Sequence, residues 1–114
     1  MTEYEDRPWG RFYVLIDSPN TKVKKLIVNP GQRLSLQSHK FRDEHWIVVK
    51  GIASVTLDDS VKNFTYGDHV FVPKGARHRI SCNSDEAVEI IEVQTGSNFA
   101  EEDITRYEDD YKRS

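Results

Sequence analysis

The chain has 114 residues, of which 37% are hydrophobic and 31% are charged, and its formal net charge is -3 at pH 7. This length accommodates one domain, which we expect to span residues 1–114, and the composition is that of an ordinary globular protein. A small acidic net charge without a basic block argues against a nucleic-acid partner.

Three features indicate where the protein resides. No apolar run approaches the roughly 20 residues that a membrane-spanning helix needs. The first ten residues, MTEYEDRPWG, are acidic and lack an apolar segment, which argues against a signal peptide. The one cysteine, Cys82, cannot form a disulfide within the chain, as is typical of a reducing compartment. We therefore expect a cytoplasmic protein with no membrane partner.

The chain reads as a succession of short strands separated by turn residues. An irregular N-terminal segment, in which Trp9 is expected to anchor the chain, precedes the first of them. The segments on either side of Gly51 are expected to form a hairpin. Turn signals every 8–12 residues or so are typical of an all-β sandwich or barrel. Strands are predicted at residues 11–16, 22–29, 44–50, 52–57, 61–65, 69–72, 78–82 and 87–94.

The C-terminal segment, residues 101–111, has a different pattern. Ile104, Tyr107 and Tyr111 recur at helical spacing, which predicts a short amphipathic helix. Its acidic residues are expected to form a solvated face.

Four polar residues have the spacing of a metal site. Gln37 and His39 are two apart, so an extended strand places both side chains on one face. Glu44 follows five residues after His39, and His78 follows the turn at residues 73–75. Two imidazoles, a carboxylate and an amide oxygen could bind one divalent metal and leave positions open for water or substrate. Such an open site is catalytic in type, and it also suits the facial triad of iron oxygenases.

Two other histidines, His45 and His69, have no place in this pattern. His45 neighbours Glu44 and should therefore point to the opposite face of its strand. We expect both residues to be structural or exposed.

The spacing of these ligands resembles that of the cupin family. Residues 31–51 are similar at every spacing to the first cupin motif, except that Gln37 stands where the motif usually has a histidine. Residues 67–83 resemble the second motif, with Asn83 one position late. More closely, the chain resembles the cupin domain of type II phosphomannose isomerases, usually the C-terminal half of bifunctional isomerase/mannose-1-phosphate guanylyltransferases. The matching segments are RPWGRF, PGQRLSLQSH, EHWIVVKGIASVT, VPKGARHRI, IEVQTG and EEDITRYEDDY.

This resemblance implies a fold and a reaction. The fold would be a cupin jelly-roll barrel of two antiparallel sheets with one divalent metal ion, zinc first, or cobalt, manganese, iron or nickel. The reaction would be the interconversion of mannose 6-phosphate and fructose 6-phosphate, in which a proton moves between C1 and C2. Two alternatives stay open: a metal-dependent sugar-phosphate binding module without catalysis, and an iron-dependent cupin oxygenase.

Five further residues are candidates for handling the sugar phosphate. The base could be Lys24, which the resemblance favours over Lys25 as the inward residue, or Glu92, or a metal-bound hydroxide. Arg42 and Arg79 lie close in sequence to Glu44 and His78, and a guanidinium suits phosphate. Gln94 shares one strand face with Glu92, so both are expected to line the cavity.

We also expect a homodimer. A barrel of this size has exposed edge strands, and pairing them between copies is a common remedy. Trp9 and the strand at residues 11–16 are the candidate contacts.

Overall fold

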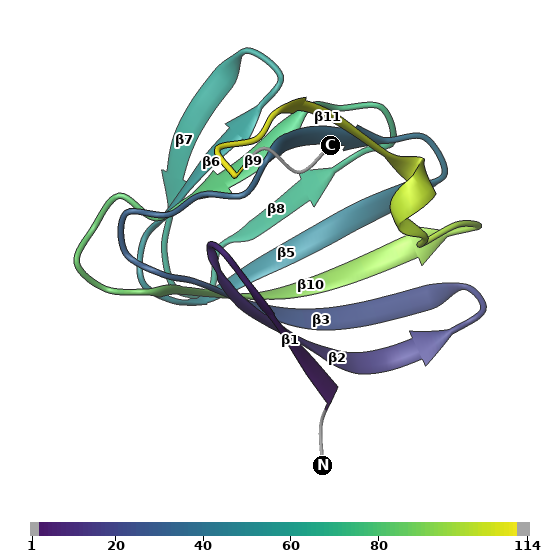
Figure 1. Cartoon of the computed structure of the whole chain (residues 1–114), viewed down its shortest axis with the longest axis horizontal. Helices are drawn as coiled ribbons and strands as arrows, with labels where there is room; N and C mark the ends of the chain where they lie inside the picture. Colours follow the sequence, from purple (N-terminus) through teal and green to yellow (C-terminus); the bar gives the residue numbers. More distant parts are fainter. Residues whose placement is uncertain (1–2, 112–114) are drawn as a thin grey trace.

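A computed structural model describes residues 3–111, which form two antiparallel β-sheets packed face to face (Figure 1). The six-stranded sheet contains, in spatial order, β1 (Glu3–Arg7), β2 (Gly10–Ser18), β3 (Thr21–Val28), β10 (Val88–Gly96), β5 (Arg42–Lys50) and β8 (His69–Val72). The five-stranded sheet contains β11 (Ile104–Glu108), β4 (Leu36–His39), β9 (His78–Ser81), β6 (Ala53–Leu57) and β7 (Ser60–Phe64). The predicted all-β fold with two antiparallel sheets is confirmed. Within residues 3–111, no helix is long and apolar enough to cross a membrane.

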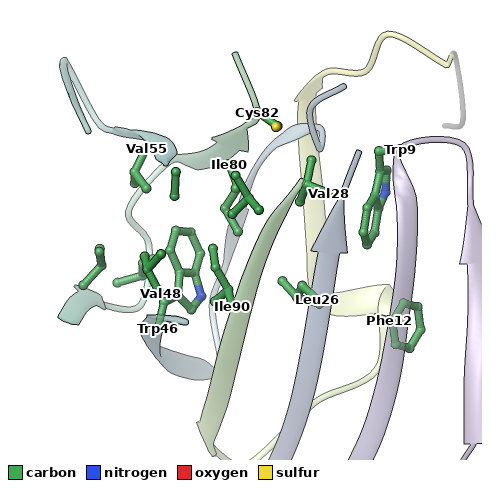
Figure 2. Close-up of a cluster of buried hydrophobic side chains, with 14 of the residues drawn as sticks. Trp9, Phe12, Leu26, Val28, Trp46, Val48, Val55, Ile80, Cys82 and Ile90 are labelled. Atoms are coloured by element: carbon green, nitrogen blue, oxygen red, sulfur yellow. The ribbon is translucent and has the colours of Figure 1, made fainter. Parts of the chain in front are cut away.

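The space between the sheets is filled by alternate side chains of the strands. On β5, Trp46 and Val48 are buried, while Ile47 between them is exposed. Ile90 on β10 joins them from the same sheet, and Ile80 is among the residues that pack against them from the other sheet (Figure 2). Because side chains of a strand alternate between its two faces, the core residues and the site residues below share one inward face.

The predicted hairpin around Gly51 is wrong. β5 pairs with β10 and β8, whereas β6 pairs with β7 and β9, so the two strands belong to different sheets. Gly51 has a φ of 78°, and a Cβ there would lie 2.6 Å from the carbonyl oxygen of Ala87. Glycine is therefore required where the chain leaves one sheet and enters the other.

The predicted C-terminal helix is also wrong. Residues Glu101–Asp103 form a single 3-10 turn, η1, and the following strand β11 pairs with β4. The ladder sets Ile104 opposite His39 and Arg106 opposite Gln37. The apolar residues at helical spacing misled the prediction because β4 offers an edge to pair with, which the local pattern does not reveal.

Core packing predicts a large loss of stability on truncation of Ile90, which is fully buried. Ile90→Ala should lower the free energy of unfolding by about 2–5 kcal/mol, because the change leaves a cavity between the sheets. Ile52→Ala is the matched control. Ile52 is 43% exposed, so this change should lower the free energy of unfolding by no more than about 0.5 kcal/mol. Urea unfolding curves measure both. Equal losses would contradict the position assigned to Ile90.

The homodimer stays a prediction. Trp9 is buried within this chain, and the predicted contact strand at residues 11–16 lies in β2, next to β1. β1 forms an exposed edge of the six-stranded sheet. We expect light scattering to give twice the 13.2 kDa chain mass at micromolar concentration. A monomeric mass under those conditions would show that this edge stays unpaired between copies.

Candidate metal centre

Both sheets contribute ligands to one point in the barrel interior. Glu44 lies on β5 of the six-stranded sheet, while His39 and His78 lie on the neighbouring strands β4 and β9 of the other sheet. One ligand atom of each residue lies within 4.8 Å of the others, and all three residues are buried. The imidazole rings have a centroid separation of 4.9 Å. The structure therefore brings together three of the four predicted ligands as a compact set.

Two hydrogen bonds orient these ligands. The indole Nε1 of Trp46 donates to Oε1 of Glu44 at 3.0 Å. The Nδ1 of His78 donates to the carbonyl oxygen of Ala76 at 3.1 Å, since a carbonyl can only accept. This bond leaves the lone pair of His78 on Nε2, which lies 3.9 Å from Glu44 Oε1. Outer hydrogen bonds of this kind are what hold metal ligands in register.

The electrostatics set the protonation states of two of the ligands, Glu44 and His78. Burial alone would raise the pKa of Glu44, but its hydrogen bond with His39 and the positive charges around it bring that pKa well below its usual range. Burial lowers the pKa of His78, an effect that the charge of Glu44 opposes only in part. At neutral pH the carboxylate is charged and this imidazole is neutral, as metal binding requires.

The guanidinium of Arg42 lies against the same ligand atoms. Its Nε donates to Glu44 Oε2 at 3.0 Å, and its Nη2 lies 3.1 Å from His39 Nε2. That His39 nitrogen is also 3.1 Å from Glu44 Oε2. One ring nitrogen cannot both donate to the carboxylate and accept from the guanidinium. A cation bound by His39 and Glu44 would satisfy the two ligands together, so the residues present fit a metal ion.

A cavity of about 90 Å³ adjoins this set. Gln37, Lys24 and Arg42 line it, together with Glu92 and Gln94. In the β-ladders, Glu92 lies opposite Lys24 on one side and Trp46 on the other, while Gln94 lies opposite Glu44. The placement of Gln37 is compatible with a fourth ligand, and its Nε2 donates to Ser35 Oγ at 3.0 Å. Its role in metal binding stays a prediction.

Lys24 and Glu92 form the titratable pair of the cavity. The ammonium of Lys24 lies 4.4 Å from the centre of the Phe12 ring, and burial lowers its pKa although the charge of Glu92 opposes this. Burial, with help from the charge of Glu44, raises the pKa of Glu92 to about 7. The amide of Gln94 donates to the Glu92 carboxylate. Lys25 instead pairs with Glu89 at 3.0 Å.

The structure does not bring Arg79 to the cavity, so it does not support the predicted contact with substrate. Arg79 follows His78 on β9 and points to the opposite face, as alternation requires. There its Nη1 donates to Glu108 at 3.0 Å and its Nε to the carbonyl of Leu34 at 2.8 Å. His45 and His69 also lie outside the site, and their ring nitrogens are 3.1 Å apart.

The sequence reasoning missed two charged residues of the cavity, Arg7 and Arg106. Arg106 on β11 lines the cavity beside Gln37, its partner in the ladder. The helix predicted for residues 101–111 concealed it, because only a strand places Ile104 and Arg106 on one face. A second cavity, of about 440 Å³, is lined by residues of β6, β7 and β8 and of the turn between β6 and β7, and contains none of the predicted site residues.

Comparison with known proteins places this site in a family. Residues 2–109 match the family described as "Mannose-6-phosphate isomerase C-terminal". The chain belongs to this family. The match includes the four predicted ligands, the cavity residues Lys24 and Glu92, and β11.

Proteins of polysaccharide biosynthesis are among the relatives. The xanthan biosynthesis protein XanB of Xanthomonas campestris is 44% identical over 95% of this chain. The alginate biosynthesis protein AlgA of Pseudomonas aeruginosa is also 44% identical over 95%. A mannose-1-phosphate guanylyltransferase of Sinorhizobium fredii is 39% identical over 91%. The chain spans only 20% to 23% of the length of these relatives.

Solved structures show the fold. An RmlC-like cupin from Shewanella frigidimarina superposes with a TM-score of 0.77 over 86% of each chain, at 24% identity. Oxalate decarboxylase of Bacillus subtilis superposes with a TM-score of 0.81 over 92% of this chain and 30% of its own, at 23% identity. The fold is therefore the predicted cupin barrel.

The ligand geometry predicts how metal content responds to mutation. His39→Ala and His78→Ala should each abolish bound divalent metal after dialysis, because each removes one imidazole from a set of few ligands. Gln37→Ala should have a milder effect, since a neutral amide oxygen is a weaker ligand. His45→Ala is the control, because His45 follows Glu44 on β5 and points to the outer face of that strand. Elemental analysis of the purified proteins measures all four, and full metal content in His78→Ala would contradict the site.

Proposed function

We propose that the chain is a metal-dependent isomerase that interconverts mannose 6-phosphate and fructose 6-phosphate. Its family is named for mannose-6-phosphate isomerase, and its barrel holds a metal-ligand set and a titratable carboxyl in one interior. The observation that carries the proposal is the position of Glu92, a buried carboxyl on the strand beside that of Glu44. Burial raises the pKa of this carboxyl to about 7. Proton transfer at neutral pH needs a group with such a pKa.

The metal would be held by His39, Glu44 and His78, with Gln37 as the fourth ligand. Zinc is the first choice because two imidazoles and a carboxylate suit it, and cobalt, manganese, iron and nickel suit related ligand sets. When bound, the ion would polarise the hydroxyl and carbonyl oxygens of the sugar.

Glu92 is the candidate base. The isomerisation removes a proton from C2 of the aldose and returns one to C1 of the product, while the hydroxyl and carbonyl exchange places. An ionised Glu92 accepts the first proton and, once protonated, can return it. Gln94 orients the carboxyl through its amide hydrogen bond, and Lys24 faces it across the ladder. A positively charged Lys24 would stabilise the ionised form of Glu92.

Arg42 has a supporting role on the ligand side of the cavity. Its Nη1 donates to the carbonyl of Phe99 at 3.1 Å, while its other nitrogens contact Glu44 and His39. With its nitrogens engaged in this way, Arg42 orients the carboxylate and adds positive charge to the cavity wall. This charge would favour an anionic sugar over a neutral one.

The raised pKa predicts the pH dependence of turnover. Because the base is the ionised carboxylate, kcat should increase as pH rises through about 7 and level off above it. Glu92→Gln should lower kcat by about 10²- to 10⁴-fold and leave metal content unchanged. Glu89→Gln, on the other face of β10, is the matched control and should retain activity. Wild-type activity in Glu92→Gln would remove Glu92 from the mechanism.

A metal add-back assay tests the function itself. The protein is stripped with a chelator, reloaded with zinc, cobalt, manganese, iron or nickel, and assayed with mannose 6-phosphate and fructose 6-phosphate. Turnover restored by metal is the expected result. Saturable sugar-phosphate binding without turnover under any metal would indicate a binding module, and oxygen uptake with iron alone would indicate an oxygenase.

The cellular location is part of the proposal. A sugar phosphate is a cytoplasmic metabolite, and the lone thiol of Cys82 is buried and forms no disulfide within the described residues. Cell fractionation should therefore recover the protein with the cytoplasmic enzymes.

A further inference from the structure

Among residues 3–111, three buried side-chain polar atoms have no hydrogen-bond partner: His39 Nδ1, Gln94 Oε1 and Arg106 Nε. Gln94 and Arg106 both line the cavity of about 90 Å³ beside the metal-ligand set. Leaving such a group unpaired is costly, at about 1–3 kcal/mol and more for a charged one. Unpaired groups that line a cavity therefore point to a missing ligand, and a guanidinium N–H points to an acceptor.

The charges around the cavity indicate what kind of acceptor. Arg7, Lys24, Arg42 and Arg106 line it as cations, against the single carboxyl of Glu92. Arg42 is already bonded to Glu44, whereas the Nε of Arg106 is unpaired. An excess of positive charge with a guanidinium donor suits a phosphate or carboxylate group. At about 90 Å³, the cavity is well below the roughly 300 Å³ of a complete small-molecule site, so it is the size of a subsite.

The strand β11 determines where Arg106 lies. Its ladder with β4 sets Arg106 opposite Gln37, and the register then shifts between Arg106 and Glu108. Tyr107, between them, points away from the cavity and bonds to Ser38 at 2.9 Å. Any movement of this strand would therefore displace the Arg106 side chain from the cavity.

Arg79 holds β11 at the point where the register shifts. Its Nη1 donates to the carboxylate of Glu108 at 3.0 Å and its Nη2 to the backbone carbonyl of the same residue at 3.2 Å. Its Nε donates to the carbonyl of Leu34, just before β4. The buried Arg79 thus joins β11, through two hydrogen bonds to Glu108, to the segment that leads into β4, through one hydrogen bond to Leu34.

We propose that Arg106 binds the anionic group of the substrate and that Arg79, acting through Glu108, is the residue that positions it. The proposal rests on the proposed function in taking that group to be the phosphate of a hexose 6-phosphate. The sequence suggested Arg42 and Arg79 for the phosphate contact. The proposal moves this contact to Arg106, two positions before Glu108, the residue that Arg79 holds.

Steady-state kinetics with mannose 6-phosphate tests the role of Arg106. Arg106→Gln should raise KM by about 10- to 100-fold with little change in kcat, because it removes a charge-assisted bond to the phosphate, a group that is the same before and after the proton transfer. Arg106→Lys keeps the charge but loses the planar guanidinium, so its KM should lie between those of wild type and Arg106→Gln. Lys62→Gln, which removes a charge from the exposed strand β7, is the control and should match wild type.

A double mutant tests the positioning role. Arg79→Lys should raise KM, and the double variant Arg79→Lys/Arg106→Gln should be no worse than Arg106→Gln, since both changes remove the same contact. Losses that multiply would assign Arg79 a separate structural role and overturn that half of the proposal. Thermal unfolding of each variant shows whether it is folded, and Arg106→Lys replaces Arg106→Gln if the latter is not.

Calorimetric titration with inorganic phosphate separates this proposal from the isomerase. Wild type should bind phosphate, and Arg106→Gln should bind it about 10- to 100-fold more weakly. That result without isomerase turnover would overturn the proposed function and leave the anion site in place. Turnover in wild type, with equal phosphate affinity and KM in Arg106→Gln, would overturn the anion site alone. Absence of phosphate binding in wild type would also overturn the anion site.

Discussion

The buried charge of Glu44 is the constraint on which the site depends. A carboxylate taken out of water into a barrel interior costs several kcal/mol unless neighbours compensate for it. Here Trp46 donates to one oxygen, and Arg42 and His39 contact the other. These contacts also keep the carboxylate ionised and fixed in direction. The contacts that offset the cost of burying Glu44 therefore also orient its carboxylate as a metal ligand.

Strand register links this carboxylate to the rest of the chemistry. β10 lies between β3 and β5, so one ladder sets Glu92 opposite Lys24 and the other sets Gln94 opposite Glu44. Because side chains alternate, a slip of one residue would turn Glu92 and Gln94 outward and bring Ile91 and Val93 inward. The apolar core at Ile90 and Val88 therefore holds the register that the polar site requires.

Local patterns predicted what is local. The two-residue spacing of Gln37 and His39, and of Glu92 and Gln94, correctly placed each pair on one face, and most strand positions were found within a few residues. Pairing between distant segments was not visible in this way: Gly51 joins two sheets rather than two hairpin strands, and β11 is a strand because β4 pairs with it. Arg79 was assigned to the cavity from its nearness to His78 in sequence, although neighbours on a strand point to opposite faces.

The central claim is that Glu92 moves a proton between carbon atoms next to a metal held by Glu44. Nuclear magnetic resonance of mannose 6-phosphate with metal-loaded protein in D₂O tests it most directly. The account predicts that fructose 6-phosphate signals grow while the C2 proton signal of mannose 6-phosphate is lost to deuterium. A C2 proton signal that stays unchanged, although mannose 6-phosphate binds the protein saturably, would contradict it.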